Sequence, residues 1–320
     1  MNGSRMNFKS NKKVLIIVGS TAVGKTDLSI RLAELINGEI ISADSRLLYK
    51  GMDIGTAKPS KAQLRTVQHH MVDIANPQET WSLSMYKEQV MIAIEDVQSR
   101  GKLPILVGGT GQYVRSLLEG WDIPVVAPDE DMRRVLETWG REIGVRELHK
   151  KLQIIDPVAA GMNDPDNLRR IVRALEVIFL TGFRFSDQRL RAARQHHYKV
   201  IGLIRPRPEL YKRVDDRIDS MFSGGFVREV ENLLSSGIPR ETPSLSAIGY
   251  SEVIRYLHGE ISLEEVKAMM KKKTRNFIRK QTNWFKPDDP DIEWFEMEPD
   301  PIEEISSSIK IWLRKRQSSE

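Results

Sequence analysis

The sequence contains no cysteine, no long apolar run and no large excess of one charge, and each absence narrows the class of protein. Without cysteine there is no disulfide framework, thiol nucleophile or thiolate metal site, which is typical of a reducing compartment. No uninterrupted apolar run approaches the roughly 18 residues of a spanning helix. The first 13 residues are polar and basic and lack the apolar centre of a signal peptide. We therefore expect a cytoplasmic protein with no membrane partner.

The charge balance is nearly even, with 49 Lys and Arg against 44 Asp and Glu, a net charge of +5. A nucleic-acid surface must therefore be a local concentration of basic residues. The length of 320 residues favours two domains, or one core with a large insertion. The chain shows no internal repeat, its composition is ordinary for a folded protein, and a monomer is favoured.

Short apolar strands alternate with helices in the first 120 residues. Residues 14–18, 40–43 and 104–107 have the continuous apolar character of strands that are buried on both faces. Residues 28–36 and 86–97 place apolar side chains at helical spacing between them. This alternation predicts an α/β fold with a parallel sheet and helices on both faces.

Three strand-end loops of this sheet contain Lys25, Asp44 and Thr110. Ligands of open parallel sheets bind beyond the carboxyl ends of the strands. We therefore expect these three side chains to face one crevice.

The pattern changes from Gly120 onward. Two prolines within residues 123–128 predict an extended linker. Helical spacing follows in residues 132–139 and 168–178, and a strand at 199–204 resumes the alternation. We predict a loose tail (1–12), a core (13–117 and 199–320) and an all-helical insertion (118–198).

The motif GSTAVGKT at residues 19–26 lies between a strand and a helix and matches the phosphate-binding loop, or P-loop. Its glycines let backbone N–H groups surround phosphate oxygens at a helix N-terminus. Lys25 is a point charge for the terminal phosphates, and the Thr26 hydroxyl can ligate Mg²⁺. The predicted phosphate-binding residues are Gly19, Ser20, Thr21, Ala22, Val23, Gly24, Lys25 and Thr26.

The motif does not define the reaction. An NTPase of this class usually has a second strand that ends in a metal-binding Asp. Here the strand at 104–107 ends in Gly-Gly-Thr, and residues 71–73 are too short a run to persuade. Asp44 is either that metal ligand or a general base that faces the phosphate pocket. The pattern leaves both interpretations open.

A long helix begins at a capping box, Ser262-Leu-Glu-Glu265, and continues into a basic stretch. Between Val266 and Pro287 there are eight Lys or Arg residues and no acid. An acid-free face suggests a polyanionic partner, although a charged face that binds nothing is the alternative. Helical spacing places apolar residues on one side (Val266, Met270, Phe277, Trp284) and polar ones on the other (Lys272, Arg275, Arg279, Asn283, Lys286).

A second basic region extends from Arg184 through Arg189, Arg191 and Arg194 to Arg205 and Arg207. Together with Arg169, Arg170 and Arg173 of the insertion, we expect this region to form a second surface for the same polyanion. The paired histidines at 69–70 and 196–197 have no carboxylate at ligand spacing, which argues against a metal site. Trp284 either stacks on a base or packs in the core.

These residues resemble the tRNA dimethylallyltransferase family over nearly the whole chain after the tail. The longest signature is ISADSRLLYKGMDIGTAKP at residues 41–59. The other similar stretches are residues 19–26, 107–113, 163–177, 247–250 and 274–285. Departures from the family pattern occur at Ser20, Val23 and Gln112. The resemblance implies a P-loop NTPase-like sheet on which the loop holds the diphosphate of a prenyl donor.

The implied reaction transfers a dimethylallyl group from dimethylallyl diphosphate to the exocyclic amine of the tRNA adenosine just 3′ of the anticodon, with Mg²⁺. Asp44 is then the base, and Thr110 orients Asp44 or the diphosphate. Lys25 and Arg217, with Arg213 as the alternative, stabilise the leaving group. The implied tRNA contacts are Asp44, Ser45, Arg46, Leu47, Thr110, Arg133, Arg169, Arg170, Arg173, Lys272, Arg275, Arg279 and Gln281.

Three other functions compete with this one. A nucleoside or nucleotide kinase of the same fold would transfer a phosphoryl group from ATP. An adenylate isopentenyltransferase would prenylate free AMP and have little use for a basic helix. A non-catalytic RNA-binding ATPase module would form no prenylated product.

Overall fold

The computed structural model describes residues 12–121, 129–187 and 196–315. It divides the chain into two units, residues 1–118 with 195–320 and residues 119–194. The bounds of the predicted insertion, 118–198, are close to those of the smaller unit. The linker predicted at 123–128, residues 1–11 of the tail, and Arg189, Arg191 and Arg194 of the second basic region lie outside the described residues.

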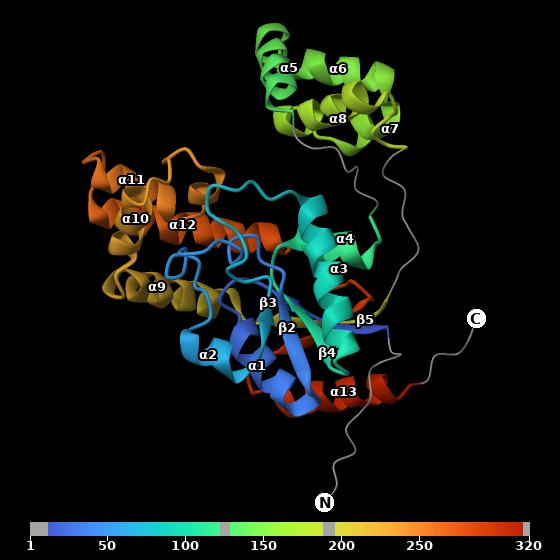
Figure 1. Ribbon diagram of the computed structural model, residues 1–320, viewed down its shortest axis with the longest axis vertical. Coiled ribbons are helices and arrows are strands. Elements are labelled where there is room, and N and C mark those ends of the chain that lie inside the picture. Colours follow the sequence, from blue (N-terminus) through green and yellow to red (C-terminus); the bar gives the residue numbers. More distant parts are fainter. Residues whose placement is uncertain (1–11, 122–128, 188–195, 316–320) are drawn as a thin grey trace, which may run out of the picture. The chain divides into compact units, whose positions relative to one another are not determined.

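The larger unit is built on a six-stranded parallel sheet of order β3-β2-β4-β1-β5-β6 (Figure 1). Its strands are β1 (Lys13–Gly19), β2 (Gly38–Ser42), β3 (His69–His70), β4 (Leu103–Val107), β5 (His197–Ile204) and β6 (Ile292–Glu296). The four inner strands include all those predicted from apolar runs. The two edge strands escaped prediction because β3 has only two residues and β6 mixes exposed with buried positions.

Helices cover both faces of the sheet, as predicted: α1 packs with α13 on one face and α3 with α4 on the other (Figure 1). The helices of this unit are α1 (Lys25–Ile36), α2 (Lys61–Thr66), α3 (Leu83–Ser99), α4 (Gly111–Leu118), α9 (Arg207–Ser223), α10 (Phe226–Ser235), α11 (Tyr250–Leu257), α12 (Leu263–Gln281) and α13 (Ile302–Arg314), with a 3₁₀ turn η1 (Pro243–Ser246). None of the helices in the described part of the chain is apolar over a length that could cross a membrane.

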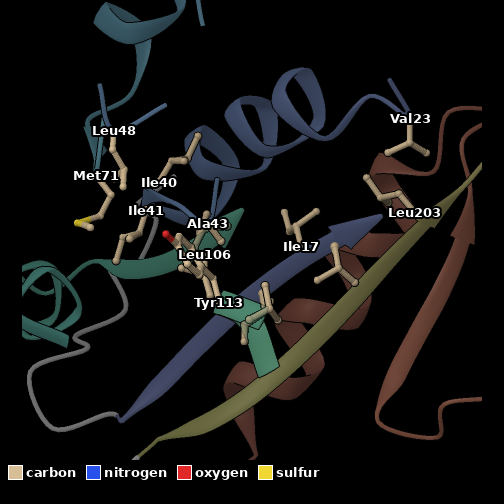
Figure 2. Close-up of a cluster of buried hydrophobic side chains, with 14 of the residues drawn as sticks. Ile17, Val23, Ile40, Ile41, Ala43, Leu48, Met71, Leu106, Tyr113 and Leu203 are labelled. Atoms are coloured by element: carbon tan, nitrogen blue, oxygen red, sulfur yellow. The ribbon is translucent and has the colours of Figure 1, made fainter. Parts of the chain in front are cut away.

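The sheet core extends directly beneath the carboxyl ends of the strands. Figure 2 shows Ile17 of β1, Ile41 of β2 and Leu106 of β4 in one cluster with Tyr113 of α4. The three strand residues are fully buried. Removing such side chains from water is the main favourable contribution to folding, so the loops that follow these strands start from fixed positions.

The smaller unit is all helical, with α5 (Glu130–Ile143), α6 (Val145–Ile155), α7 (Pro157–Met162) and α8 (Leu168–Thr181). It has its own apolar core, to which Leu136, Leu152 and Leu175 contribute. Predicted helices at 132–139 and 168–178 correspond to α5 and α8. The unit therefore meets the usual requirement for an independent domain, a core of its own.

A buried carboxylate organises this helical unit. The Glu176 side chain is fully buried on α8 and accepts hydrogen bonds from the Asp129 N–H (2.8 Å), from Arg133 Nε (3.0 Å) and from Arg173 (2.8 Å). Arg133 and Arg173, which the resemblance assigns to tRNA, are therefore ion-pair partners within the unit. Arg169 and Arg170 are exposed at the start of α8.

Candidate active site

A cavity of about 470 Å³ opens at the carboxyl ends of β1, β2 and β4. Lys25, Asp44 and Thr110 all line it, so the predicted convergence of the three strand-end loops is present in the structure. Arg213 and Arg217 of α9 also line it. Apolar side chains also line it, from α9, α12 and the segment before α11: Ile218, Met221, Ala247, Ile248, Met270 and Phe277.

Lys25 is the first residue of α1, at the end of the P-loop. Its Nζ donates to the carbonyl oxygens of Gly19 (3.0 Å) and Ser20 (2.9 Å). Desolvation in the cavity lowers the pKa of Lys25 to about 8; nearby Asp44 opposes this shift and Arg217 adds to it. Among the residues that the structure describes, no carboxylate forms an ion pair with this ammonium, and a bound anion would stabilise it.

Two arginines hold the P-loop from outside. Arg213 Nε donates to the Ala22 carbonyl (2.8 Å), and Arg205 Nε donates to the Val23 carbonyl (3.0 Å). Because these cations engage the carbonyl oxygens of the loop, its geometry is fixed before any phosphate binds. Arg205, which the sequence placed on a second basic surface, has a side chain only 8% exposed and pairs with Glu209 and Glu298.

Arg217 lies one helical turn beyond Arg213 and also lines the cavity. Desolvation lowers the pKa of Arg217, Arg213 lowers it further, and Asp27 opposes the shift. With Arg213 bonded to the loop backbone, Arg217 is the arginine of this pair that remains placed for a ligand anion. The structure thus favours the first of the two predicted arginines.

The loop after β2 presents Asp44 to the cavity. One carboxylate oxygen, Oδ1, accepts from the Arg46 N–H (2.9 Å). Thr110 stabilises the same loop, because its Oγ1 accepts from the Ser45 N–H (3.4 Å) and its own N–H donates to the Ala43 carbonyl (3.3 Å). Thr110 therefore orients the segment that carries Asp44, and its hydroxyl proton is free to donate to a ligand.

A glycine allows this close approach of two loops. A Cβ on Gly108 would lie 2.2 Å from the Ala43 carbonyl oxygen, so a larger residue would push the loops apart. Beneath them the rings of Tyr86 and Tyr113 stack, with centroids 3.7 Å apart. The Tyr86 hydroxyl donates to the Ser42 carbonyl (3.1 Å), and burial raises the pKa of Tyr86 well above its usual value. The Tyr86 phenol is thus neutral and supports the end of β2, from which the Asp44 loop starts.

Three other predicted tRNA contacts on this loop, Ser45, Arg46 and Leu47, do not share the same surroundings. The Arg46 guanidinium donates to the carbonyls of Pro243 (3.1 Å) and Ser244 (3.2 Å) in η1. It is therefore engaged in joining the loop to η1. Ser45 and Leu47 line the cavity beside Asp44.

The segment at 53–58 is fixed by residues that sequence reasoning missed. Lys58, whose side chain is 3% exposed, pairs with Asp53 and Asp73. Asp73, the acid considered for a metal, is therefore engaged by an ammonium. Glu229 of α10 accepts from the N–H groups of Asp53 (2.9 Å), Ile54 (2.7 Å) and Gly55 (3.1 Å). No local pattern announces these pairs, because their partners lie up to 176 residues apart.

The cavity offers few protein oxygens for a magnesium ion, so most of the coordinating oxygens would come from substrate phosphates and water. Thr26 lines it, as does Asp27, whose carboxylate accepts from Gln63 (2.9 Å). Within the described residues no group of three or more His, Asp or Glu side chains forms a metal cage. Mg²⁺ commonly binds through one or two protein oxygens with substrate phosphates and water. The donors present suit that arrangement.

The basic helix α12 ends at Gln281, earlier than the basic stretch suggested. Lys272 and Arg279 are exposed on it, as predicted. Arg275 instead pairs with Asp215 and lies over the Tyr211 ring, 5.4 Å from its centroid. A basic groove between α9 and α12 is lined by Tyr211, Ala268, Lys271, Lys272, Arg275 and Arg279.

Two residues predicted on the apolar side of this helix, Phe277 and Trp284, differ in their surroundings. Phe277 is 41% exposed and lines the main cavity. Trp284 lies beyond the end of the helix and packs against Gly111, which favours the core-packing alternative for this ring. Gln281 is only 4% exposed, and its side chain is bonded to the backbone of the cavity loops. We therefore withdraw it from the predicted tRNA contacts.

The fold and this cavity define a P-loop α/β protein with a phosphate site beside a carboxylate. A family model described as IPP transferase matches residues 47–288. The tRNA dimethylallyltransferase of Roseiflexus sp. (strain RS-1) is 48% identical over 273 residues, covering 85% of this chain and 90% of that protein. The chain belongs to the IPP transferase family.

Solved structures agree with this assignment. The crystal structure of the full-length tRNA isopentenylpyrophosphate transferase from Bacillus halodurans is 39% identical, with a TM-score of 0.70 over 95% of this chain and 97% of that one. A eukaryotic dimethylallyltransferase, captured in crystals acting on tRNA, is 26% identical with a TM-score of 0.77. The match covers 94% of this chain and 78% of that one.

Proposed function

We propose that this protein is a prenyltransferase that transfers a dimethylallyl group from dimethylallyl diphosphate to the exocyclic N6 amine of the adenosine 3′ of the anticodon in tRNA. One observation carries the proposal: the P-loop cation Lys25 and the carboxylate Asp44 line the same cavity as a group of apolar side chains. That combination suits a donor with an anionic leaving group and a hydrocarbon tail.

Stabilising the leaving group is the larger electrostatic task. As the carbon–oxygen bond of the donor breaks, negative charge grows on the diphosphate and cationic character grows on the allylic carbon. Lys25, Arg217 and the N–H groups of the P-loop are placed to receive that charge. A Mg²⁺ ion held by the Thr26 hydroxyl would supply further charge neutralisation when bound.

Asp44 is placed to collect the proton that the amine sheds. The lone pair of an adenine amine is delocalised into the ring, so the amine is a poor nucleophile. Its proton becomes acidic as the new carbon–nitrogen bond forms, and an ordinary carboxylate then accepts it. The Arg46 N–H orients Oδ1 of Asp44, and Thr110 stabilises the loop that carries it.

The acceptor base has to leave its stack to enter such a cavity. That costs least in a single-stranded loop, which fits an anticodon loop better than a duplex. Ser45 and Leu47 at the cavity, with exposed Lys272 and Arg279 on α12, support an RNA partner. Exposed Arg169 and Arg170 provide cations on the helical unit.

The direct test offers dimethylallyl diphosphate, Mg²⁺ and unmodified tRNA, followed by digestion and mass spectrometry. We expect prenylated adenosine from the wild-type protein and near-complete loss of product in Asp44→Ala, with tRNA binding retained. Asp96→Asn, which removes an exposed carboxylate on α3, is the matched control and keeps full activity.

The same assay separates the competing functions. Phosphoryl transfer from ATP without prenyl product would indicate a kinase. Prenylation of free AMP in preference to tRNA would indicate an adenylate isopentenyltransferase. RNA binding and ATP hydrolysis with no prenylated product would indicate a binding module. Any of these outcomes overturns the proposed function.

A further inference from the structure

Gln281, the last residue of α12, joins two loops of the cavity. Its Oε1 accepts from the Thr21 N–H of the P-loop (2.8 Å), and its Nε2 donates to the Gly109 carbonyl (3.1 Å) in the loop after β4. The first loop carries Lys25, and the second carries Thr110. One nearly buried side chain therefore links the phosphate site to the loop that orients Asp44.

The neutral carboxamide of Gln281 satisfies both partners at once. Thr21 presents a donor and Gly109 presents an acceptor, so the bridging side chain needs an acceptor and a donor in the same terminal group. A methionine of similar length would leave both backbone groups unpaired, and a carboxylate would place its charge against the Gly109 oxygen. A Cβ on Gly109 would lie 2.4 Å from Gln281 Nε2, so the glycine makes room for the amide.

The end of α12 is anchored on its other side as well. Arg115 of α4 donates to the Trp284 carbonyl through Nε (3.2 Å) and Nη2 (2.9 Å). A Cβ on Gly111 would lie 2.1 Å from the Trp284 ring, which shows how closely this turn fits the Gly-rich loop. A change in the position or mobility of α12 is therefore transmitted to both cavity loops.

The same helix carries the exposed cations Lys272 and Arg279. We propose that Gln281 is a positioning residue that couples tRNA binding on α12 to the conformation of the diphosphate loop. This inference rests on the proposed function. RNA that restrains α12 restrains the Thr21 N–H and the Gly109 carbonyl, and the remaining N–H groups of the P-loop are then set for the donor. By linkage, donor and RNA increase each other's affinity by the same factor.

The first experiment measures that factor by calorimetry. A non-reactive thiolodiphosphate analogue of the donor is titrated with and without an unmodified anticodon stem-loop. We expect the wild type to bind the analogue about fivefold more tightly with RNA and Gln281→Met to lose this factor. Gln98→Met, which removes a hydrogen bond from the side-chain amide near the end of α3 to the Lys13 carbonyl, keeps it.

The proposal is overturned if Gln281→Met keeps the factor or if Gln98→Met also loses it. A wild-type protein that forms prenylated product without any such factor would overturn it too. A wild-type protein that forms no product contradicts the proposed function instead. The two failures are therefore distinguishable.

The second experiment uses Gln281→Glu and a pH profile. A protonated carboxyl again offers one acceptor and one donor, whereas the carboxylate offers only acceptors. We expect kcat relative to wild type at the same pH to increase roughly tenfold from pH 8 to pH 5.5 as the acid becomes protonated. A side chain that only fills space would give a flat ratio, and that result would contradict the amide bridge.

Discussion

Two groups of basic residues in this protein differ in whether they surround a carboxylate. One lies in the core cavity around Lys25, and the other lies in the helical unit around Glu176. In the core cavity, Lys25 donates to two backbone carbonyls and its pKa is lowered to about 8. In the helical unit, Arg133 and Arg173 surround Glu176, which is fully buried. No described carboxylate is ion-paired with Lys25, whereas the second group already contains its anion.

The difference shows how to interpret clustered cations. Cations with no directly paired carboxylate repel one another and lose solvation, and both effects oppose their charge until a ligand arrives. Cations around a buried carboxylate satisfy a group that is costly to leave unpaired, so they stabilise the fold. Four tests can break or sharpen this comparison.

The largest effect is expected for Lys25→Met. It removes the point charge at the leaving group, and kcat/KM for the donor should fall by roughly 10³-fold. Steady-state kinetics measure this loss, and thermal unfolding checks that the fold is intact. Lys212→Met, an exposed lysine of α9 paired with Asp216, is the control and should retain activity. A loss of less than tenfold in Lys25→Met would show that Lys25 does not stabilise the leaving group.

The helical unit should respond to Glu176→Leu with a loss of stability. Arg133, Arg173 and the Asp129 N–H all lose their shared acceptor, and we expect about 2 kcal/mol of local destabilisation. Hydrogen exchange would show faster exchange in α5 and α8 and no change in the core. Glu137→Leu, which breaks an exposed pair with Arg141, should change exchange little. Weakened donor binding by Glu176→Leu would contradict the separation of the two groups.

The pH dependence of donor binding should report Lys25. Below its pKa of about 8 the free protein carries the ammonium, and above that pH it carries the neutral amine. Donor affinity should therefore be constant below about pH 7 and fall by up to tenfold per pH unit above pH 8. Calorimetry with the thiolodiphosphate analogue measures it. Lys25→Arg should lack this inflection, because a guanidinium stays charged over that range.

The smallest effect concerns two cations on α12 itself. Arg279 is exposed, whereas Arg275 is paired with Asp215. Arg279→Gln should weaken tRNA binding about fivefold and lower its salt slope by about one. Arg275→Gln should cost less, because its charge is already partly neutralised. Equal effects of the two substitutions, measured over a salt series, would show that the Asp215 pair opens when RNA binds.

Local patterns predicted the inner strands, the P-loop and the start of α12, which carries a capping signal. The α1 helix ends at Asn37 in the left-handed region, and α12 begins with the Ser262–Glu265 capping box. These features depend on neighbouring residues only. Edge strand β3 was missed because two residues carry no periodicity.

The partners of charged side chains could not be predicted in the same way. Arg205, Arg133 and Arg173 belong to basic stretches of sequence, yet their contacts are with the P-loop carbonyl and with buried or neighbouring acids. Lys272 and Arg279 also lie in a basic stretch of sequence, yet their side chains are exposed. Charge patterning gives the sign of a surface and not the presence of a buried counter-ion.

The chain of amino acids by itself determined the parallel sheet, the P-loop and the acid that follows β2, because each depends on residues close in sequence. Only the tertiary structure decided which cations are paired, that Arg213 rather than Arg217 is bonded to the P-loop backbone, and that Gln281 joins two loops. Those properties arise from contacts between segments up to 260 residues apart, where distance and burial act and sequence spacing carries no signal.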